Sequence, residues 1–432
     1  MNMIRFSHFT IEVTPPIGHA LCGGLVKPAQ GVRDPIYARG MILDDGRTRV
    51  VLCAVEFCAI DDTAHRQAVQ ALSRGAGISS RNVALHTVHQ HDVPYVHLDA
   101  EPLLKKHGIG QLDEIWWASI VKKLGQAAEV ASKRMRCVTA VGVGETRIVG
   151  GASNRRLVGS NGKVLAMRHS MSTDPKLQAW PVGLIDPLLR AITLWNGQKL
   201  VASLSYYATH PQSAYGRGLV SADAIGEALR LTRERFPSAQ HIYFSGCGAN
   251  ITFGKYATKN LEGNIRLFGG RIASGIARAI HNSEKQRVKP GPMRWRALSV
   301  KLPFRLRPRR ADLKERLRNH ETWLGQRVLA AWALVSSARA REVSRVMVQS
   351  LKLGPAWVVH LPSEVFVEYQ LYAQALRPEE FVAVAAYGDG KMFYLPTKEA
   401  FRQGGYETGE YACCTTPSIE PLLKEMITRL LK

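Results

Sequence analysis

Apolar stretches of strand length alternate with helical patterns along nearly the whole of this 432-residue chain. The run Arg49–Ile60 has the composition of a buried strand, and Asn82–Val88 that of the next one. Between them, Asp61 and Asp62 are suited to begin a helix that runs to Arg74. Because strands and helices alternate in this way, we expect an α/β protein. The prediction is one large domain over residues 1–432, with mixed central β-sheets flanked by helices.

Turn signals and helical periodicity extend this prediction to the rest of the chain. Hairpins are expected at Asn196-Gly197 and at Gly354-Pro355. Helices are expected over Leu112–Met135, Glu262–His281 and Ile419–Leu431. The arginine-rich stretch Arg305–Arg318 is expected to open a long surface helix that ends near Glu342.

Histidine is concentrated in one short segment. Four of the 14 histidines, His86, His89, His91 and His97, lie in the sequence LHTVHQHDVPYVH, and His210 ends another apolar run. Imidazole is the commonest metal ligand and the usual general acid or base near neutral pH. His89 and His91 follow a predicted strand, and ligands of open α/β sheets bind beyond the carboxyl ends of the strands. The pattern therefore predicts a metal-dependent hydrolase.

His89, His210 and Glu364 each follow a predicted strand and together form a candidate ligand set. Three nitrogen or oxygen ligands with one open position are the usual catalytic zinc arrangement. Each residue alone also has a plainer interpretation: Glu364 is equally suited to the positive end of a helix dipole. Of the other histidines, His86 is expected in the core or behind the ligands, and His97 in a loop.

The glycine-rich loop GCGAN, Gly246–Asn250, follows another predicted strand. Its backbone is suited either to bind an anion or to turn tightly beside the site. It is not a phosphate-binding P-loop, because no Gly-Lys-Ser/Thr follows at the required spacing. Cys247 within it is either a nucleophile with His210 as its base or, more commonly for a single cysteine, a buried and inert thiol.

The chain is strongly basic, with 58 Lys and Arg against 35 Asp and Glu, giving a net charge of +23. This charge is compatible with an anionic membrane surface or another polyanion, and equally with a simply basic solvated surface. No sequence-specific nucleic-acid motif accompanies it. No apolar run is long enough to span a bilayer, and the first residues lack the apolar segment of a signal peptide. We therefore expect a cytoplasmic protein whose seven cysteines are reduced and mostly buried.

Several short motifs, in the same order along the chain, resemble the neutral/alkaline non-lysosomal ceramidase family. The opening segment TPPIGHALCGG and the strand pair DPIYARGMILDDG resemble the start of that family. Its HTHSGPG block corresponds to the segment from His89 to Pro94, and its ATHxxS block to Ala208–Ser213, followed by Val220–Asp223. Its PGE segment corresponds to Pro362–Glu364, and its YVTT segment with a tyrosine twelve residues later to Tyr394–Thr397 and Tyr406.

The resemblance implies a set of site residues. The zinc ligands of the family fall on His89, His210, Glu364 and Tyr394, and the tyrosine ligand is implied by the resemblance alone. Its substrate-contacting histidine and tyrosine fall on His91 and Tyr406. Its arginine near the substrate matches Arg155 in the sequence Ser-Asn-Arg-Arg. Members of the family are zinc amidases of sphingolipid metabolism that cleave the N-acyl bond of ceramide.

Three departures from the family bear on the substrate. Ala249 stands where the family carries an active-site serine, and Asp92 adds a carboxylate next to His91. We expect Asp92 either to serve the site or to cap a turn before Pro94. The C-terminal immunoglobulin-like domain of the family is not expected, since the chain ends shortly after Tyr406.

The sequence therefore predicts a zinc-dependent hydrolase that cleaves a linear amide by metal-activated water, with Zn²⁺ as its cofactor. The substrate is expected to be a small N-acyl or lipid-like compound. Two alternatives remain open: a non-catalytic metal-binding descendant of the family, and a basic protein that binds anionic lipid or polyanion surfaces. The sequence leaves the oligomeric state open.

Overall fold

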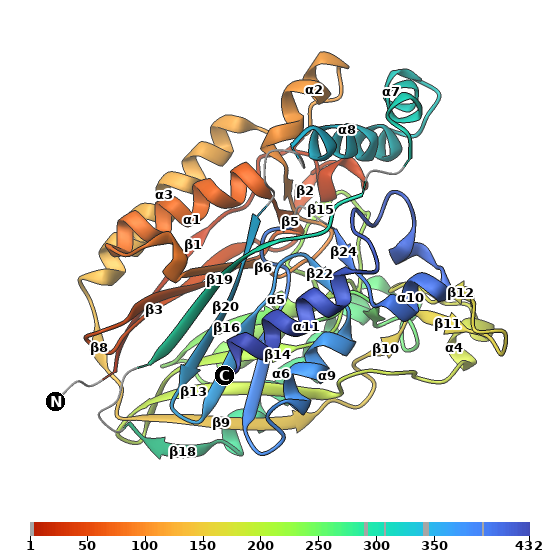
Figure 1. The fold of residues 1–432 in the computed structure, drawn as a ribbon. Helices are drawn as coiled ribbons and strands as arrows, with labels where there is room; N and C mark the ends of the chain where they lie inside the picture. The colour runs from red at the N-terminus through yellow and green to blue at the C-terminus, as the bar shows by residue number, and fades with distance from the viewer. Residues whose placement is uncertain (1–3, 289–292, 306–307, 340–344, 391–392) are drawn as a thin grey trace.

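Three β-sheets form the framework of the computed structural model, which describes residues 4–288, 293–305, 308–339, 345–390 and 393–432 (Figure 1). The first sheet has the order β6-β4-β3-β1-β8, the second β16-β14-β13-β9-β18, and the third β19-β20-β21-β23. The strands of the first sheet are β1 (Arg5–Glu12), β3 (Tyr37–Asp44), β4 (Arg49–Val55), β6 (Val83–Thr87) and β8 (Arg136–Cys137). Those of the second are β9 (Ala140–Arg147), β13 (Leu188–Asn196), β14 (Lys199–Tyr207), β16 (Gln240–Ser245) and β18 (Glu284–Arg287). Those of the third are β19 (Arg294–Lys301), β20 (Arg345–Leu353), β21 (Ala356–His360) and β23 (Phe381–Ala385).

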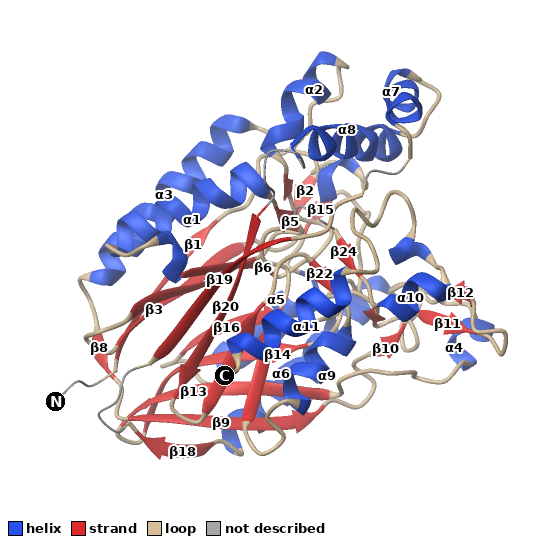
Figure 2. Ribbon diagram, viewed as in Figure 1, coloured by secondary structure: helices blue, strands red, loops and turns tan. Residues whose placement is uncertain are grey.

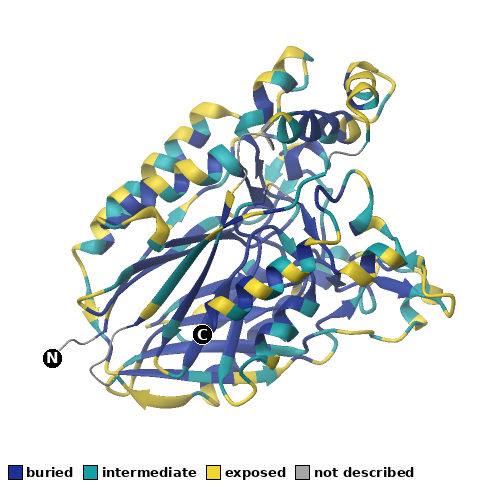
Figure 3. Ribbon diagram, viewed as in Figure 1, coloured by how far each residue is buried: buried dark blue, intermediate teal, exposed yellow. Residues whose placement is uncertain are grey.

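One apolar core lies among the three sheets. Met41 of β3, Leu204 of β14 and Val358 of β21 belong to the same buried cluster, although they come from three different sheets. Alternating strand residues point inward, as expected for a sheet with one face in a core. Burial of this apolar surface is the main favourable contribution to folding. Figure 3 shows the resulting contrast between buried strands and outer helices with exposed faces.

Pairs of helices cover the outer face of each sheet (Figure 2). Helices α1 (Asp62–Ala76) and α3 (Glu114–Ser132) pack together on the first sheet, and α5 (Asp223–Arg235) and α6 (Leu261–His281) on the second. Helices α9 (Val367–Ala375) and α11 (Ile419–Leu430) lie against the third. The remaining elements are short, apart from two helices treated below: α2 (Glu101–Lys106), α4 (Pro175–Ala179), α10 (Lys398–Gln403), β2 (Gly31–Val32), β5 (Ala59–Ile60), β7 (Tyr95–Val96), β10 (Ser153–Asn154), β11 (Arg156–Val158), β12 (Val164–Met167), β15 (Leu219–Val220), β17 (Ile251–Thr252), β22 (Glu364–Val365) and β24 (Tyr394–Leu395), with 3-10 turns at Cys22–Gly24, Ser80–Asn82, Leu98–Ala100 and Tyr406–Thr408.

Each of these sheets contains one parallel strand pair, and the carboxyl ends of the three pairs meet. The pairs are β4 with β6, β14 with β16, and β21 with β23. Thr87 N–H donates to Tyr387 O at 2.8 Å, which ties the first sheet to the third. Ala386 N–H donates to Ser245 O at 2.9 Å, and Ser245 Oγ donates to Val88 O at 2.7 Å, which ties the second sheet to the other two. The loops that follow six strands are thereby brought to one place.

The predicted α/β class and both predicted hairpins are confirmed. The strands β13 and β14 pair antiparallel around Asn196-Gly197, where Gly197 has a φ of 59°. The strands β20 and β21 turn at Gly354, whose φ of 55° is in the left-handed region that glycine adopts without strain. The expected strand Arg49–Ile60 is shorter than predicted, because β4 ends at Val55 and the chain turns before β5.

The predicted long surface helix after the arginine-rich stretch is wrong in two respects. The chain forms two helices, α7 (Arg310–Arg318) and α8 (Leu324–Arg339), and the side chain of Asn319 between them accepts a hydrogen bond from Glu321 N–H. Such a local side-chain bond competes with helical backbone bonding and ends α7. Helix α8 is largely buried, because its apolar segment packs Trp332 against Tyr95. Residues 306–307 and 340–344 of the predicted stretch lie outside the described residues.

No helix in the described ranges combines the length and the apolar character that a membrane span requires.

Candidate metal centre

His89, His210 and Glu364 converge where the three parallel pairs end. His89 follows β6, His210 follows β14 and Glu364 begins β22 shortly after β21. The Nε2 atoms of His89 and His210 each lie 3.3 Å from the same carboxylate oxygen, Glu364 Oε2. One ligand atom from each residue therefore falls within 4.8 Å of the other two. Each of the three large sheets supplies one of them.

Backbone carbonyls fix the tautomers of both imidazoles. His89 Nδ1 lies 2.7 Å from Cys58 O, and His210 Nδ1 lies 2.6 Å from Gly248 O. A carbonyl oxygen accepts only, so Nδ1 carries the proton and Nε2 presents a lone pair toward Glu364. Burial lowers the pKa of His210 to about 4, with Arg155 as a further cause, so this imidazole is neutral near pH 7.

A cation between the buried atoms that face one another here would stabilise them. His89 Nε2, His210 Nε2 and Glu364 Oε2 have no hydrogen-bond partner among the described residues. Two lone pairs and a carboxylate oxygen in contact repel one another, and buried polar atoms without partners are costly. A metal ion removes both costs, and a histidine that donates its other N–H to a carbonyl is the usual arrangement of a ligand. The residues therefore fit a divalent metal of the kind that binds nitrogen and oxygen.

Tyr394 lies directly beside Glu364. The short strands β22 and β24 are parallel, and Glu364 is paired with Tyr394 in their register. The Tyr394 ring stacks on that of His210, with the ring centroids 6.4 Å apart. The structure thus brings together all four of the residues that the family resemblance implies as ligands.

Unusual backbone conformations gather around this centre. Among the residues that the structure describes, the non-glycine positions with positive φ include His89 (73°), Ser363 (58°) and Tyr387 (61°). Left-handed conformations cost non-glycine residues free energy and persist where the surroundings enforce them, which is common at functional sites. Tyr387 also stacks on His89, with the ring centroids 4.4 Å apart. The imidazole of His89 is therefore held at its edge by the Cys58 carbonyl and on its face by Tyr387.

Arg155 lies at the same centre and is fixed by a buried carboxylate. Its Nε donates to Glu407 Oε1 at 2.7 Å, while Arg156 Nη1 donates to the other oxygen at 2.6 Å. The Arg155 guanidinium lies over the rings of Tyr394 and Tyr406, at 5.2 Å and 5.7 Å from their centroids. Its Nη2 is buried and has no hydrogen-bond partner among the described residues, so it remains available to a ligand.

Tyr406 and His91 border the centre. Tyr406 is half exposed, and its ring lies 5.7 Å from that of Tyr394. The ring of His91 lies 5.3 Å from that of His89, and its Nε2 is 2.5 Å from the side-chain amide nitrogen of Gln212. The ring of each residue therefore contacts the ring of a candidate ligand.

Asp92 is directed at a neighbouring loop. Its Oδ1 accepts the N–H of Gly216 at 2.7 Å, and its backbone oxygen accepts the N–H of Ser221 at 3.0 Å. Asp92 thus links the histidine segment to the chain that follows His210. This contact differs from both expectations for Asp92, a partner of an imidazole and a cap of the turn before Pro94.

The other candidates from the sequence contribute to packing or to the backbone conformation. His86 is buried, donates from Nδ1 to Ala386 O and joins the core. His97 packs on Trp332, with the ring centroids 5.3 Å apart. In the glycine-rich loop, a Cβ on Gly248 would lie 2.7 Å from the backbone of Thr209, so glycine allows the loop to approach the strand end that carries His210. Cys247 is buried, and burial raises the pKa of its thiol.

Two residues at this centre were not singled out from the sequence: Cys58 and Glu407. Cys58 contributes a backbone carbonyl, which carries no sequence signal. Tyr387 was predictable as a residue that follows a strand, but its left-handed conformation was not. Glu407 is completely buried between two arginines, and a pair of adjacent arginines such as Arg155 and Arg156 is the signal that points to such a carboxylate.

Comparisons with known proteins show which proteins share this fold. Two solved structures share the fold: one described as a ceramidase complexed with C2, and the neutral ceramidase from Pseudomonas aeruginosa. Each is 15% identical to this chain; the TM-scores are 0.76 and 0.75, and the matches cover 100% of this chain and 75% and 74% of the other. A search of curated protein sequences found no significant match.

Residues 15–261 match the family model of the N-terminal part of neutral/alkaline non-lysosomal ceramidases. This match covers more than half of the chain, and it contains the segments of His89 and His210. The predicted family is therefore confirmed: the chain belongs to the neutral/alkaline non-lysosomal ceramidase family of hydrolases.

Proposed function

We propose that this protein is a zinc-dependent amidohydrolase whose metal is held by His89, His210, Glu364 and Tyr394. The observation that carries the proposal is the convergence of two lone-pair-bearing Nε2 atoms on one buried Glu364 oxygen, with both Nδ1–H groups on carbonyls. Two imidazoles and a carboxylate are a ligand set of catalytic zinc sites. A zinc ion bound here supplies Lewis acidity, which polarises a scissile carbonyl and acidifies a water molecule.

The residues around the ligands have the chemistry to position an acyl group. The free Nη2 of Arg155 can donate a hydrogen bond to a substrate oxygen, and Glu407 holds the guanidinium in place. The half-exposed Tyr406 can donate its O–H to the oxyanion that develops on the carbonyl. His91 is placed to move a proton between the attacking water and the leaving amine.

We propose a small N-acyl compound as the substrate, with a polar one favoured over ceramide. Arg155 favours an oxygen-rich or anionic group near the scissile bond. Ala249, fully buried, stands where the family carries its active-site serine, so the acyl-binding side of this site differs from that of a ceramidase. The high positive charge is compatible with a lipid substrate presented at an anionic membrane surface.

Metal analysis combined with a substrate screen tests the proposal. Purified protein is expected to hold zinc and to release free acid from a panel of ceramide, N-acyl amino acids and N-acyl anilides. His210→Ala is expected to lose both the metal of this centre and turnover. His241→Ala is the matched control, because His241 is also buried but contacts Ser203 and Phe236 far along the second sheet. Full turnover in demonstrably metal-free protein would exclude the mechanism.

A second candidate function is metal binding without turnover. Ala249 favours it, because the family residue at that place takes part in catalysis according to the resemblance. The variant Ala249→Ser separates the two candidates. A protein that binds zinc, is inactive on the whole panel and gains turnover with Ala249→Ser is a non-catalytic descendant.

A further inference from the structure

Two thiols and an imidazole form a second cluster of potential metal ligands beside the first. Cys22 Sγ and Cys58 Sγ lie 3.6 Å apart, and one ligand atom each from Cys22, Cys58 and His91 falls within 4.8 Å of the others. Both cysteines are buried and reduced. Neither thiol has a role in the proposed hydrolysis. We propose that Cys22, Cys58 and His91 bind a second metal ion, zinc, in a thiolate-rich site adjoining the first.

The backbone holds both thiols against the histidine segment. Cys22 N–H donates to Val93 O at 2.8 Å, and Cys58 N–H donates to Pro94 O at 2.9 Å. Val93 and Pro94 follow His91 by two and three residues, so three distant pieces of chain are fixed to one another at this point. A site whose ligands are positioned before the ion binds loses little conformational entropy on binding.

The backbone of Cys22 adopts a left-handed conformation in a turn that packs against α8. Its φ is 47°, in the left-handed region, and it begins a 3-10 turn that continues with Gly23 and Gly24. A Cβ on Gly23 would lie 2.3 Å from Trp332 Cη2, so the turn is pressed against α8. This constraint directs the Cys22 thiol toward Cys58. A strained non-glycine residue that places a reactive side chain is typical of a functional site.

The separation of the sulfurs fits a shared metal. Two thiolates on one tetrahedral zinc, at about 2.3 Å each, lie about 3.8 Å apart. A disulfide requires about 2.05 Å, which would need the two segments to move. Two thiolates and one neutral imidazole also balance the charge of a divalent ion. Thiolate ligands select zinc or monovalent copper over the hard cations.

Gln212 orients the imidazole for this role. Its amide contacts His91 Nε2 at 2.5 Å and Ser170 Oγ at 3.0 Å. The amide nitrogen faces His91 Nε2 in the structure, so metal binding at Nδ1 requires the amide to turn over, with Nε2–H donating to the amide oxygen. An ion bound at this second site occupies His91, so the proton transfer proposed for His91 belongs to the form in which the second site is empty. The ligands of the proposed zinc hydrolase centre are unchanged.

Cobalt titration of the metal-free, reduced protein distinguishes the two sites. Cobalt bound to sulfur produces a thiolate-to-metal charge-transfer absorption that a site of histidine, glutamate and tyrosine lacks. Wild-type protein is expected to bind two equivalents of cobalt and to develop this absorption. His210→Ala is expected to bind one equivalent and to keep the absorption. Cys22→Ser is expected to bind one equivalent and to lose it.

The controls separate loss of a ligand from loss of the fold. Cys137→Ser removes a cysteine outside the cluster and is expected to bind two equivalents. Cys22→Gly removes the thiol while accepting the left-handed φ without strain, so it is expected to fold and to bind one equivalent.

Three results would overturn the inference. They are a wild-type protein that binds one equivalent without the charge-transfer absorption, an absorption that survives in both Cys22 variants, and a Cys22–Cys58 disulfide in protein that has been handled under reducing conditions. None of these results bears on the His210 site, whose loss is measured separately.

Discussion

At the scale of single residues, the candidate centre depends on which atom of each side chain is left free. Two carbonyls occupy Nδ1 of His89 and His210, and one carboxylate occupies Nε of Arg155. This leaves Nε2 of each histidine and Nη2 of Arg155 without a hydrogen-bond partner among the described residues. The tautomers are consequences of backbone position. A substitution that keeps the side chain but moves the carbonyl is therefore expected to weaken metal binding.

The two tyrosines of the centre are expected to have different roles. Tyr394→Phe removes the proposed ligand oxygen and should lower metal affinity by more than the roughly 10–100-fold typical of losing a residue behind the ligands. Tyr406→Phe should keep the metal and lower kcat, because it removes a donor to the developing oxyanion. Zinc competition with a chromophoric chelator and steady-state kinetics measure the two effects. Equal metal affinity of Tyr394→Phe and wild type would remove Tyr394 from the ligand set.

Asp92 is expected to support a loop. Asp92→Asn retains an oxygen acceptor for Gly216 N–H and should change metal affinity and turnover by less than a few-fold. Asp92→Ala leaves that N–H unsatisfied and should lower the free energy of unfolding by about 1–3 kcal/mol. Chemical denaturation and kinetics of both variants check this. A 10–100-fold loss in Asp92→Asn would instead place the carboxylate in the catalytic machinery.

At the scale of elements, two buried histidines join separate sheets. His86 of β6 accepts at Nε2 from Nδ1–H of His360 of β21 at 2.9 Å, and donates from its own Nδ1 to Ala386 O. This pattern requires a neutral His86, because its Nε2 accepts a hydrogen bond while its Nδ1 carries the single proton. Burial lowers the pKa of His86 to about 4 and that of His360 well below its usual value.

Acid should therefore destabilise the junction between these sheets. The unfolded chain takes up a proton on His86 near pH 6.5, whereas the folded chain does so near 4, so stability falls as the pH drops through this window. The loss amounts to about 3 kcal/mol at about 1.36 kcal/mol per pKa unit. His86→Asn should flatten the pH dependence of the unfolding free energy, while the exposed His320→Asn should not. An unchanged slope in His86→Asn would contradict the assignment.

The 3-10 turn at Cys22–Gly24 offers a matched test of packing against α8. Gly23 and Gly77 have nearly the same φ, 64° and 65°, but a Cβ on Gly77 meets no atom within 4 Å. Gly77→Ala should lower the free energy of unfolding by about 1–2 kcal/mol, because alanine is strained at this φ. Gly23→Ala should cost about 1–3 kcal/mol more, because its methyl group meets Trp332. Urea denaturation of the pair gives the difference, and equal costs would refute the contact.

Part of this element structure could be read from the sequence, and part could not. His89 and His210 were predictable because polar residues directly after apolar runs lie at strand ends. Tyr394 was available only through the resemblance, because its pairing with Glu364 depends on a register between two short strands. Cys22 has a left-handed conformation in a turn whose next residue, Gly23, lies against Trp332 of α8, far away in sequence, and no local pattern encodes this contact. For the same reason α8 was predicted exposed although tertiary packing buries it.

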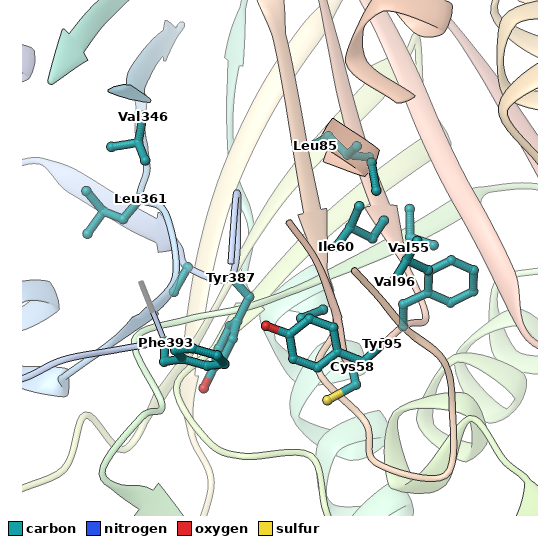
Figure 4. Packing of buried hydrophobic residues seen from close by; sticks show 14 of the residues in the cluster. Val55, Cys58, Ile60, Leu85, Tyr95, Val96, Val346, Leu361, Tyr387 and Phe393 are labelled. Atoms are coloured by element: carbon teal, nitrogen blue, oxygen red, sulfur yellow. The ribbon is translucent and has the colours of Figure 1, made fainter. Parts of the chain in front are cut away.

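At the scale of the whole molecule, the three sheets enclose one core and present their parallel ends to one point. Figure 4 shows part of a second buried cluster next to this point, where Cys58, Tyr95, Tyr387 and Phe393 come from separate segments of the chain. Of the ligands proposed for the first metal, His89, His210 and Glu364 lie in segments that follow strands of the first, second and third sheet. Binding of the ion is therefore coupled to the position of every sheet relative to the others.

Metal removal is expected to lower the stability of the whole fold in one transition. An ion that binds only the folded chain stabilises it by about 4 kcal/mol when its free concentration is 1,000 times the Kd. Chelation should therefore lower Tm without splitting the unfolding curve. His210→Ala should have the lower Tm already and should respond to the chelator only through the second proposed site. Differential scanning calorimetry measures both, and a chelator-insensitive wild type would disprove the coupling.

The convergence of three parallel strand pairs also dictates the order of events during folding. Most of the chain separates His89 from Glu364 in sequence. Their approach therefore closes a very long loop, which is expected to be a slow and late step. A nascent chain that contains only the first two sheets has two imidazoles but no carboxylate to complete the set. Capture of an ion by His89, His210 and Glu364 is thus expected to require the docked third sheet, and a molecule loaded at that centre is one whose topology is already complete.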